Sequence, residues 1–421
     1  MSTGNPVLPL TETVEPSDRA AVRDAVRDAY GADTPVYPIG GRTCLHYGVR
    51  PALPGIGLSL GRLARVVDYP ARDLTITVEA GITMADLAAQ LAKERQRLPV
   101  DVVQSDRATA GGVVATNRAG PRRYRCGTIR DYVIGIQAVD GTGMVFSGGG
   151  RVVKNAAGYN LCRLLTGSLG TLGVITQVTF MVKPIPESSA FLACELPDYH
   201  TADRLLADLV DGPTLPAAIE FLAGPVWRDD PAVPAAWSSS MGRLVVGFEG
   251  TEPEVGWMLD QLSSRWSEAG IASPVTVSAD RAGPLWHRLT EVLARLPDGE
   301  EPDRLTIEIR VLPGATMELV ARLREVDPNC SIQAHAGDGV ILARLAPDPD
   351  QAVGVLGDRI RPAVAAAGGH LVVLSYPRNI ELDRSAVWGP PGDGAAVMQA
   401  IKDRFDPKGL LNPGRFAYGD R

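Results

Sequence analysis

The stretch TAGGVVATNRAG (residues 109–120) decides which fold this chain adopts. From Thr109 to Ala115 its side chains are small apart from two valines, so a flat ligand could approach the backbone closely. Thr116 and Asn117 add hydrogen-bonding groups suited to such a ligand. Because a lone glycine loop more often serves packing, the interpretation depends on the segments that flank this one.

Two further glycine-rich segments flank it. PIGGRTCLHYG (38–48) follows a strand-like run, and its paired glycines predict either a tight hairpin or a turn with positive φ whose N–H groups face an anion. GGGRVVKNAAGYN (148–160) precedes LTGSLGTLGVI (165–175), whose glycines permit close backbone approach before a buried strand. GIGLSLG (55–61) imitates a dinucleotide fingerprint, but its spacing is wrong and no helix is expected after it.

The periodicity predicts an α+β fold. Short β-branched runs alternate with glycine turns to about residue 183, with helices expected over Asp18–Tyr30, capped by Ser17, and Thr83–Arg97. After the stiff break Lys183-Pro-Ile-Pro186, strand-like and helix-like runs alternate, which is typical of an antiparallel sheet covered on one side. We therefore expect three parts: residues 1–185, 186–385, and a return segment, 386–421.

Two details of the second part bear on the sheet. The Pro-, Ala- and Trp-rich segment 212–240 predicts an irregular insertion. A helix is expected over Leu285–Leu296, where apolar residues recur at helical spacing.

Composition excludes several classes of protein. The 421 residues suffice for two or three domains, and 45% apolar with 22% charged residues suits a soluble globular chain. A net charge of −7 with dispersed basic residues argues against nucleic-acid binding. The five cysteines are scattered without a C-x-x-C pair, so no local zinc or iron–sulfur site is expected. Without a secretory signal or an apolar run of ~18 residues, we expect a cytoplasmic protein with no direct membrane insertion.

Taken together, these segments resemble the PCMH-type FAD-binding domain of the vanillyl-alcohol-oxidase superfamily, most closely that of the smaller FAD-binding subunit of bacterial glycolate oxidase. The resemblance implies a two-subdomain FAD-binding domain and an α/β cap domain, whose antiparallel sheet has ferredoxin-like elements. It rests on PIGGRTCLHYG (38–48), VEAGITMADLAAQL (78–91), LPVD (98–101), TAGGVVATNRAGPRRYRCGTIRDYVIGIQAVDGTG (109–143), GGRVVKNAAGYNLCRLLTGSLGTLGVITQVTF (149–180) and LLNPGRF (410–416).

The resemblance also implies residues that hold FAD. They are Gly40, Gly41, Arg42 and Thr43 at the pyrophosphate, Thr109, Gly111, Gly112, Thr116 and Asn117 along the nucleotide and flavin, Val174 and Ile175 at the adenine, and Asn412 near the isoalloxazine. Lys154 could place a positive charge near a ring carbonyl that becomes anionic on reduction, although a lone lysine is more commonly a solvated surface residue. His46 is poorly placed for a covalent tether, so we expect non-covalent FAD.

One departure from the family concerns a metal site. Catalytic 2-hydroxy-acid dehydrogenases of this superfamily carry a run similar to H-x-G-D-G-N-L-H and a later E-H-G, which together bind a metal. Here the run is HAGDGVIL (335–342), in which Leu342 replaces the second histidine, and no E-H-G follows. Because one imidazole makes a poor divalent-metal site, we expect no metal, and His335 is interpreted as a relic or structural residue.

These features favour an FAD-binding subunit of a glycolate (2-hydroxy acid) oxidase complex that converts glycolate to glyoxylate. Its partners would be a larger FAD-containing subunit and an iron–sulfur subunit, through which alone it could lie peripheral to the inner membrane. One alternative is a stand-alone FAD dehydrogenase of another hydroxy acid or alcohol, whose proton acceptor would be His335, Tyr159, His370 or Tyr376. The other is a non-catalytic FAD-bound scaffold.

Overall fold

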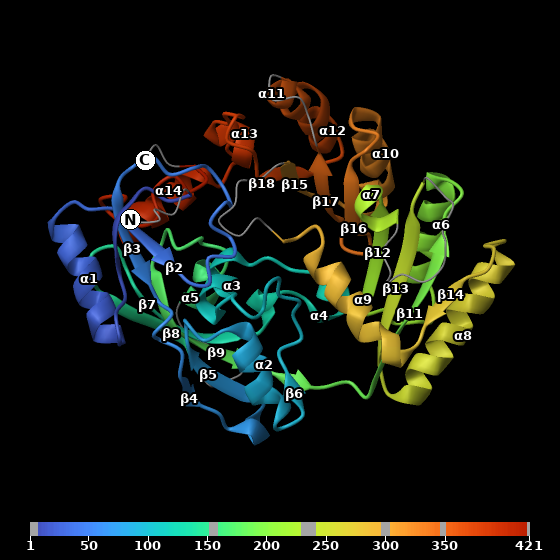
Figure 1. The fold of residues 1–421 in the computed structure, drawn as a ribbon, viewed down its shortest axis with the longest axis horizontal. Helices are drawn as coiled ribbons and strands as arrows, with labels where there is room; N and C mark the ends of the chain where they lie inside the picture. Colours follow the sequence, from blue (N-terminus) through green and yellow to red (C-terminus); the bar gives the residue numbers. More distant parts are fainter. Residues whose placement is uncertain (1–6, 151–158, 229–240, 296–303, 346–350, 419–421) are drawn as a thin grey trace, which may run out of the picture.

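The fold was analysed in a computed structural model, which describes residues 7–150, 159–228, 241–295, 304–345 and 351–418. Two α+β parts lie next to one another, one formed by the N-terminal half of the chain and the other built around a large sheet (Figure 1). The predicted α+β class with antiparallel sheets is confirmed. Among the described helices, none is long and apolar enough for a membrane span.

The N-terminal part contains a three-stranded parallel sheet, ordered β1-β3-β2, and a five-stranded antiparallel sheet, ordered β4-β5-β9-β7-β8. A small antiparallel pair, β6 and β10, adjoins them. The strands are β1 Leu10–Val14, β2 Val36–Ile39, β3 Gly55–Ser59, β4 Val66–Asp68, β5 Thr75–Glu79, β6 Gln96–Arg97, β7 Val133–Val139, β8 Val145–Gly149, β9 Val174–Met181 and β10 Lys183–Pro184.

Four of the five helices described in this part begin at side-chain caps; the short α4 (Arg123–Cys126) does not. The cap of the first helix is Asp18 rather than the expected Ser17, and Thr83 caps the second, which ends at Ala92 because the chain then turns into β6. The helices are α1 Arg19–Gly31, α2 Met84–Ala92, α3 Ala110–Thr116, α4 Arg123–Cys126 and α5 Leu161–Leu165.

The second part is built on an eight-stranded antiparallel sheet, ordered β14-β11-β13-β12-β16-β17-β15-β18. Two β-α-β-β-α-β units, each with the ferredoxin-like strand order, join edge to edge where β12 pairs with β16. The strands are β11 Ser188–Glu195, β12 Ala218–Ala223, β13 Arg243–Gly250, β14 Val275–Val277, β15 Leu305–Arg310, β16 Ser331–His335, β17 Val340–Leu345 and β18 His370–Ser375.

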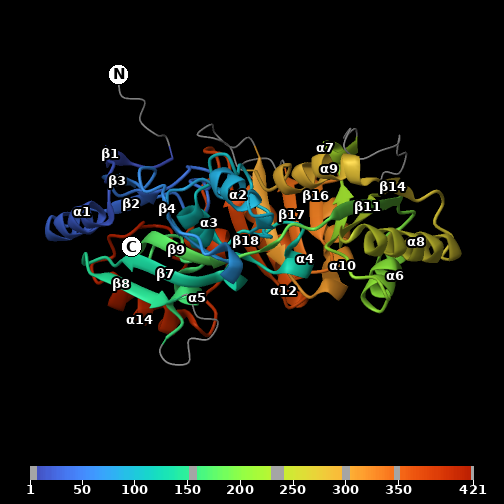
Figure 2. The same cartoon turned by 90° about the horizontal axis from the view of Figure 1, so that it is seen from below.

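Helices cover both faces of this sheet, so the expectation of a one-sided cover was wrong (Figure 2). Leu285, Trp286 and Leu289 of α9 pack on one face of the sheet, and α6, α8, α10 and α12 pack on the other. The expected range for α9 began too late because Gly283-Pro284, inside the helix, looks like a break. The helices are α6 Tyr199–Val210, α7 Pro225–Arg228, α8 Glu252–Glu268, α9 Ala279–Glu291, α10 Thr316–Val326, α11 Ala352–Gly354, which continues through a π-helical turn, Val355–Ile360, and α12 Arg361–Ala366.

Two central strands escaped the sequence pattern. β12 lies inside the segment interpreted as an irregular insertion, and β16 ends at His335, the first residue of the HAGDG run. All their residues are buried. AIEFLA of β12 shows no polar–apolar alternation, whereas SIQAH of β16 does alternate, but over only five residues, and this signal was overlooked.

The C-terminal segment returns to the N-terminal part through α13 (Arg384–Trp388) and α14 (Ala395–Phe405). Val36 N–H donates to the Leu410 carbonyl, and Asn412 N–H donates to the Val36 carbonyl, both at 2.8 Å. The Lys402 ammonium, which is buried, donates to the Thr171 carbonyl at 2.8 Å and to Asp406 at 2.5 Å. These contacts hold the C-terminal segment against the N-terminal part, next to the loop after β2. The boundaries of the three expected parts stay a prediction.

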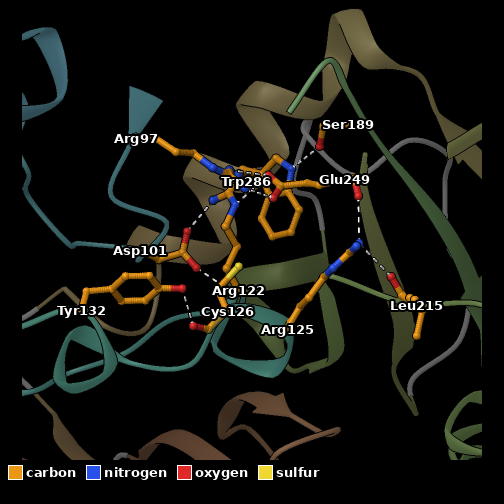
Figure 3. A network of polar contacts seen from close by, with 10 residues as sticks. All are labelled: Arg97, Asp101, Arg122, Arg125, Cys126, Tyr132, Ser189, Leu215, Glu249 and Trp286. Carbon is orange, nitrogen blue, oxygen red and sulfur yellow. Dashed lines mark hydrogen bonds and ion pairs between the residues drawn. The ribbon is translucent and has the colours of Figure 1, made fainter. Parts of the chain in front are cut away.

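A buried charge network joins the two main parts (Figure 3). Arg122 contacts Asp101 at 2.5 Å and Glu249 of β13 at 2.8 Å, and its guanidinium lies 3.7 Å from the centroid of the Trp286 ring. Arg97 adds a second pair to Glu249 at 2.6 Å. Burial alone would raise the pKa of Glu249, but Arg97 and Arg122 hold it below its usual value.

We predict that Glu249→Ala lowers the free energy of unfolding by about 3–5 kcal/mol, because it leaves Arg97 and Arg122 without their shared counter-ion. Urea denaturation at pH 7 measures the change. Glu325→Ala is the control: it removes an exposed pair with Arg322 and should cost less than about 1 kcal/mol. Equal effects of the two substitutions would contradict the structural importance of the network.

The same network predicts a pH dependence. Because the folded pKa of Glu249 is lowered, its stabilisation is fully present above the ordinary glutamate pKa of about 4.3 and is lost as pH falls through the folded value. The difference in unfolding free energy between the native chain and Glu249→Gln should therefore shrink below about pH 4.3. Unfolding curves at pH 7, 5 and 4 test this, and a constant difference would argue against it.

Candidate functional site

A cavity of about 150 Å³ lies where the glycine-rich segments meet the second part. Its walls come from the loop after β2, from the Asp101–Val103 loop, from α3, and from the segment before β9. Thr290 and Ala294, in and just after α9, close one end. The site is thus a space between the two parts.

The loop after β2 has glycines because it packs tightly against the chain before α3. A Cβ on Gly40 would lie 2.2 Å from Thr109 Oγ1, and one on Gly41 would lie 1.8 Å from the Arg107 carbonyl oxygen. The expected positive φ is instead found at Arg42, at +62°. The close approach of two backbones therefore requires these glycines. The expectation that the paired glycines have a positive φ was wrong.

The central stretch forms α3 along the cavity. Thr109 is its N-cap, and Thr116 Oγ1 donates to the Gly112 carbonyl at 3.0 Å. A Cβ on Gly111 would lie 2.7 Å from that of Ala80, so this glycine lets the helix pack against the end of β5. Asn117 ends the helix with φ +48° and does not line the cavity.

The third glycine segment and the tail complete the wall. Ile175 lines the cavity, whereas its neighbour Val174 is buried in a core cluster with Val36 and Leu58. Asn412 also lines it, held by a bond of 2.6 Å from its side-chain amide to the Leu169 carbonyl.

The structure brings together most, but not all, of the residues expected to hold the cofactor. Those that line the cavity are Gly40, Gly41, Arg42, Thr43, Thr109, Gly111, Gly112, Thr116, Ile175 and Asn412. Asn117 and Val174 lie behind its wall, and Lys154 lies outside the described residues. Tyr159, one of the catalytic candidates, is 92% exposed. The roles of all these residues stay a prediction.

Sequence reasoning missed several cavity residues, among them Tyr47, Arg118 and Arg415. All three stand inside the quoted motifs, so motif position was an available signal. Arg415 is buried and donates to the carbonyl oxygens of Leu45 and Tyr47, and burial lowers its pKa to about 10.

Polar side chains lie on the sheet face from which Tyr47 approaches. Glu308 of β15 accepts from Arg310 at 2.7 Å. Burial would raise the pKa of Glu308, but Arg310 and then Arg118 hold it below its usual value. Leu342 is opposite Glu308 in the strand register and packs in the same cluster as Tyr47. A carboxylate neutralised by arginines from both parts therefore lies beside the cavity.

His335 lies in this sheet beside a glutamate. Its Nδ1 is 2.8 Å from Glu220 Oε1, and Gln333 donates to the other oxygen of Glu220 at 2.8 Å. Burial would lower the pKa of His335, but Glu220 and then Asp338 and Asp101 raise it. His335 does not line the cavity, and across the described ranges no three His, Cys, Asp or Glu side chains gather as a metal site would require.

The residues that line the cavity suit FAD. Glycines 40, 41, 111 and 112 give parts of the wall no side chains, as a flat nucleotide needs, and the loop after β2 has backbone that could bind its phosphates. His46 does not line the cavity, and non-covalent binding of FAD stays a prediction.

Comparison with known proteins shows to which family the chain belongs. The family model for an FAD binding domain matches residues 11–149, and that for the C-terminal domain of FAD linked oxidases matches residues 185–372 and 390–416. The chain belongs to the FAD-linked oxidases. It is therefore an FAD-dependent oxidoreductase of that family.

Individual relatives of this FAD-linked oxidase differ in coverage. D-2-hydroxyglutarate dehydrogenase of Xanthomonas citri is 29% identical over 95% of this chain and 88% of its own. Glycolate oxidase subunit GlcE of Escherichia coli is 36% identical, but over 42% of this chain and 50% of its own. The solved structure of a chitooligosaccharide oxidase shares the fold, with a TM-score of 0.68, 16% identity, and coverage of 99% of this chain and 93% of its own. The resemblance to the glycolate oxidase protein GlcE is therefore only partial.

We predict that Gly41→Ala weakens FAD binding at least about tenfold, because its Cβ would collide with the Arg107 carbonyl and displace the loop. Titrating the apoprotein with FAD and following flavin fluorescence measures the dissociation constant, with circular dichroism as the check on folding. Gly256→Ala in α8, where a Cβ meets nothing within 4 Å, is the matched control and should bind FAD normally. An unchanged affinity for FAD in a folded Gly41→Ala protein would show that this loop is not part of the FAD-binding site.

Proposed function

We propose that this FAD-linked oxidase oxidises a 2-hydroxy acid to the 2-oxo acid and passes the electrons to a partner protein. The observation that supports it most is that two residues lining the cavity, Tyr47 and Arg118, lie within electrostatic reach of Glu308, which is paired with Arg310 on β15. Flavin chemistry at such a junction is shielded from water by both parts. The full-length likeness to a D-2-hydroxyglutarate dehydrogenase supports the substrate class.

Arg118 is the side chain we assign to the substrate carboxylate. It lines the cavity, is half-buried and comes from the stretch that ends α3. Its guanidinium can bind a carboxylate in a bidentate manner, a geometry that a lysine cannot offer. The nearby Glu308 is already paired with Arg310, so Arg118 does not serve as that glutamate's sole counter-ion.

When bound, FAD would accept the hydride from the α-carbon of the hydroxy acid. The chain's own task is to hold the carboxylate, exclude water and receive the hydroxyl proton. Of the expected proton acceptors, Tyr159 is exposed, whereas His335 is buried within the sheet and oriented by Glu220. Tyr376 is also buried and lies under the Arg50 guanidinium, 4.4 Å from its ring centroid to the Arg50 carbon.

A second, finer proposal is that the chain acts as a subunit of a glycolate oxidase complex. The 36% identity to GlcE over 177 residues favours it. In this arrangement a larger FAD-containing subunit and an iron–sulfur subunit would receive the electrons, and glycolate would be the substrate of the complex.

An anaerobic absorbance spectrum of the FAD-loaded chain, before and after a 2-hydroxy acid is added, tests the proposed function. We expect the flavin band near 450 nm, an approximate position for any oxidised flavin, to bleach within seconds. Bleaching only after the partner subunits are added would favour the subunit of a complex. A flavin that stays oxidised with every 2-hydroxy acid, alone and in the complex, would leave only the scaffold alternative.

A further inference from the structure

The charged residues that line the cavity between the two parts are mostly basic. Among the described residues they are Arg42, Arg118, Arg415 and a single carboxylate, Asp101. Both oxygens of Asp101 are engaged by Arg122, one by its guanidinium at 2.5 Å and the other by its backbone N–H at 2.7 Å. The positive charge of the wall is therefore not balanced by the residues that line it, and such a wall suits an anionic ligand.

Arg415 is the most deeply buried of these arginines. It is 4% exposed, whereas Arg118 is half-buried and Arg42 is exposed. Its guanidinium donates to the carbonyl oxygens of Leu45 and Tyr47, and both of these residues line the cavity. The charged end of the Arg415 side chain therefore lies against the wall of the cavity.

Among the described residues, no carboxylate balances the charge of Arg415. It forms no ion pair there, and the groups that act on its pKa are Tyr376, Tyr37, Arg50 and the Cys44 thiol. Burial is the largest influence and lowers the pKa of Arg415 to about 10, so the guanidinium is still charged at neutral pH. A buried charge is costly without an opposite charge, and neutral carbonyls are weaker partners than an anion.

Arg361 is a useful comparison within the same chain. It also donates to two backbone carbonyls, those of Leu371 and Ala386, and burial lowers its pKa as well. However, Asp383 lies within electrostatic reach of Arg361, and Arg361 does not line the cavity. Arg415 differs in both respects, which indicates that a ligand rather than the fold supplies its counter-ion.

FAD carries negative charge that could meet this guanidinium in two places. Its diphosphate is anionic in both oxidation states, whereas its ring gains negative charge only on reduction. Because the guanidinium is always charged, only the diphosphate balances it in both states. The loop favours the same choice: the resemblance implies the diphosphate at residues 40–43, and Leu45, whose carbonyl accepts from Arg415, follows in that loop.

We propose that Arg415 binds the diphosphate of FAD, with its buried guanidinium as the counter-ion. A guanidinium can bind two phosphate oxygens at once, which a lysine cannot do. The Arg415 N–H donates to the Asn412 carbonyl at 3.2 Å, and Asn412 also lines the cavity, so one turn of the C-terminal segment presents both side chains. This inference requires only the FAD that the family binds and is independent of the proposed substrate and partners.

The test is equilibrium binding of FAD to the apoprotein, followed by flavin fluorescence. Arg415→Met should weaken FAD binding by at least about thirtyfold, the effect expected when one partner of a buried charged pair is truncated. Arg415→Lys keeps the charge without the planar fork, so its affinity should lie between those of the native chain and Arg415→Met. Arg361→Met is the matched control and should bind FAD as the native chain does.

Two fragments of FAD distinguish between the diphosphate and the ring. ADP carries the diphosphate without the ring, and riboflavin carries the ring without the diphosphate. Arg415→Met should raise the inhibition constant of ADP against FAD by at least about tenfold and leave the dissociation constant of riboflavin unchanged. A loss of riboflavin affinity with unchanged ADP binding would show that Arg415 contacts the ring, and would overturn the assignment to the diphosphate.

Thermal unfolding distinguishes a binding role from a structural one. Excess FAD should raise the melting temperature of the native chain and of Arg361→Met equally, and that of Arg415→Met less, because stabilisation by a ligand falls with its affinity. If Arg415→Met only destabilises the apoprotein and keeps the native affinity for FAD, Arg415 is structural and the inference fails. Should Arg415→Met not fold, an unchanged ADP constant in Arg415→Lys would reject the inference. None of these measurements involves a hydroxy acid, so the proposed function stands or falls separately.

Discussion

The interaction on which the rest of the structure depends is the buried network of Arg122, Asp101 and Glu249. Each part has its own core, and the site exists only where the two meet. A buried charge cannot be left without a partner, so the network specifies one relative placement of the two parts more strictly than apolar contact would. Asp101 also lines the cavity, and the contact that holds the parts together therefore also shapes the place where a ligand would lie.

A second constraint acts within the N-terminal part, where backbone lies against backbone. Gly41 faces the Arg107 carbonyl and Gly111 faces Ala80, and neither contact leaves room for a side chain. The tail adds to this wall, since Asn412 bonds to the Val36 and Leu169 carbonyls. Segments far apart in the chain thus form one surface of bare peptide groups, and a nucleotide needs such a surface for its phosphates and flat rings.

The sequence alone indicated the fold class and the loops that build the cavity, because small residues in long runs are a local signal. It did not indicate β12, whose full burial hides the strand period, nor the start of α9, which Pro284 obscures. The five residues of β16 do alternate polar and apolar side chains, but so short a run was overlooked. Thr290, at the closed end of the cavity, could not be found because its place depends on packing between the two parts. Glu220 was missed for the same reason: it reaches His335 only through the pairing of β12 with β16, 115 residues apart.

The ion pairs of Arg97 and Arg122 bear both on the stability of the junction between the two parts and on which carboxylates could bind there. A carboxylate-binding site needs guanidinium donors that are not already engaged, and both Nη atoms of Arg97 and the Nε and Nη1 atoms of Arg122 are directed at Glu249 and Asp101. Breaking these pairs to bind a diacid would replace an internal counter-ion and loosen the junction that forms the cavity. Arg118 is less restricted: its Nη1 donates weakly to Cys44 Sγ at 4.0 Å, and the nearby Glu308 has Arg310 as its hydrogen-bonded partner. In the proposed function, Arg97 and Arg122 hold the two parts together, and Arg118 is left to bind the carboxylate of the substrate.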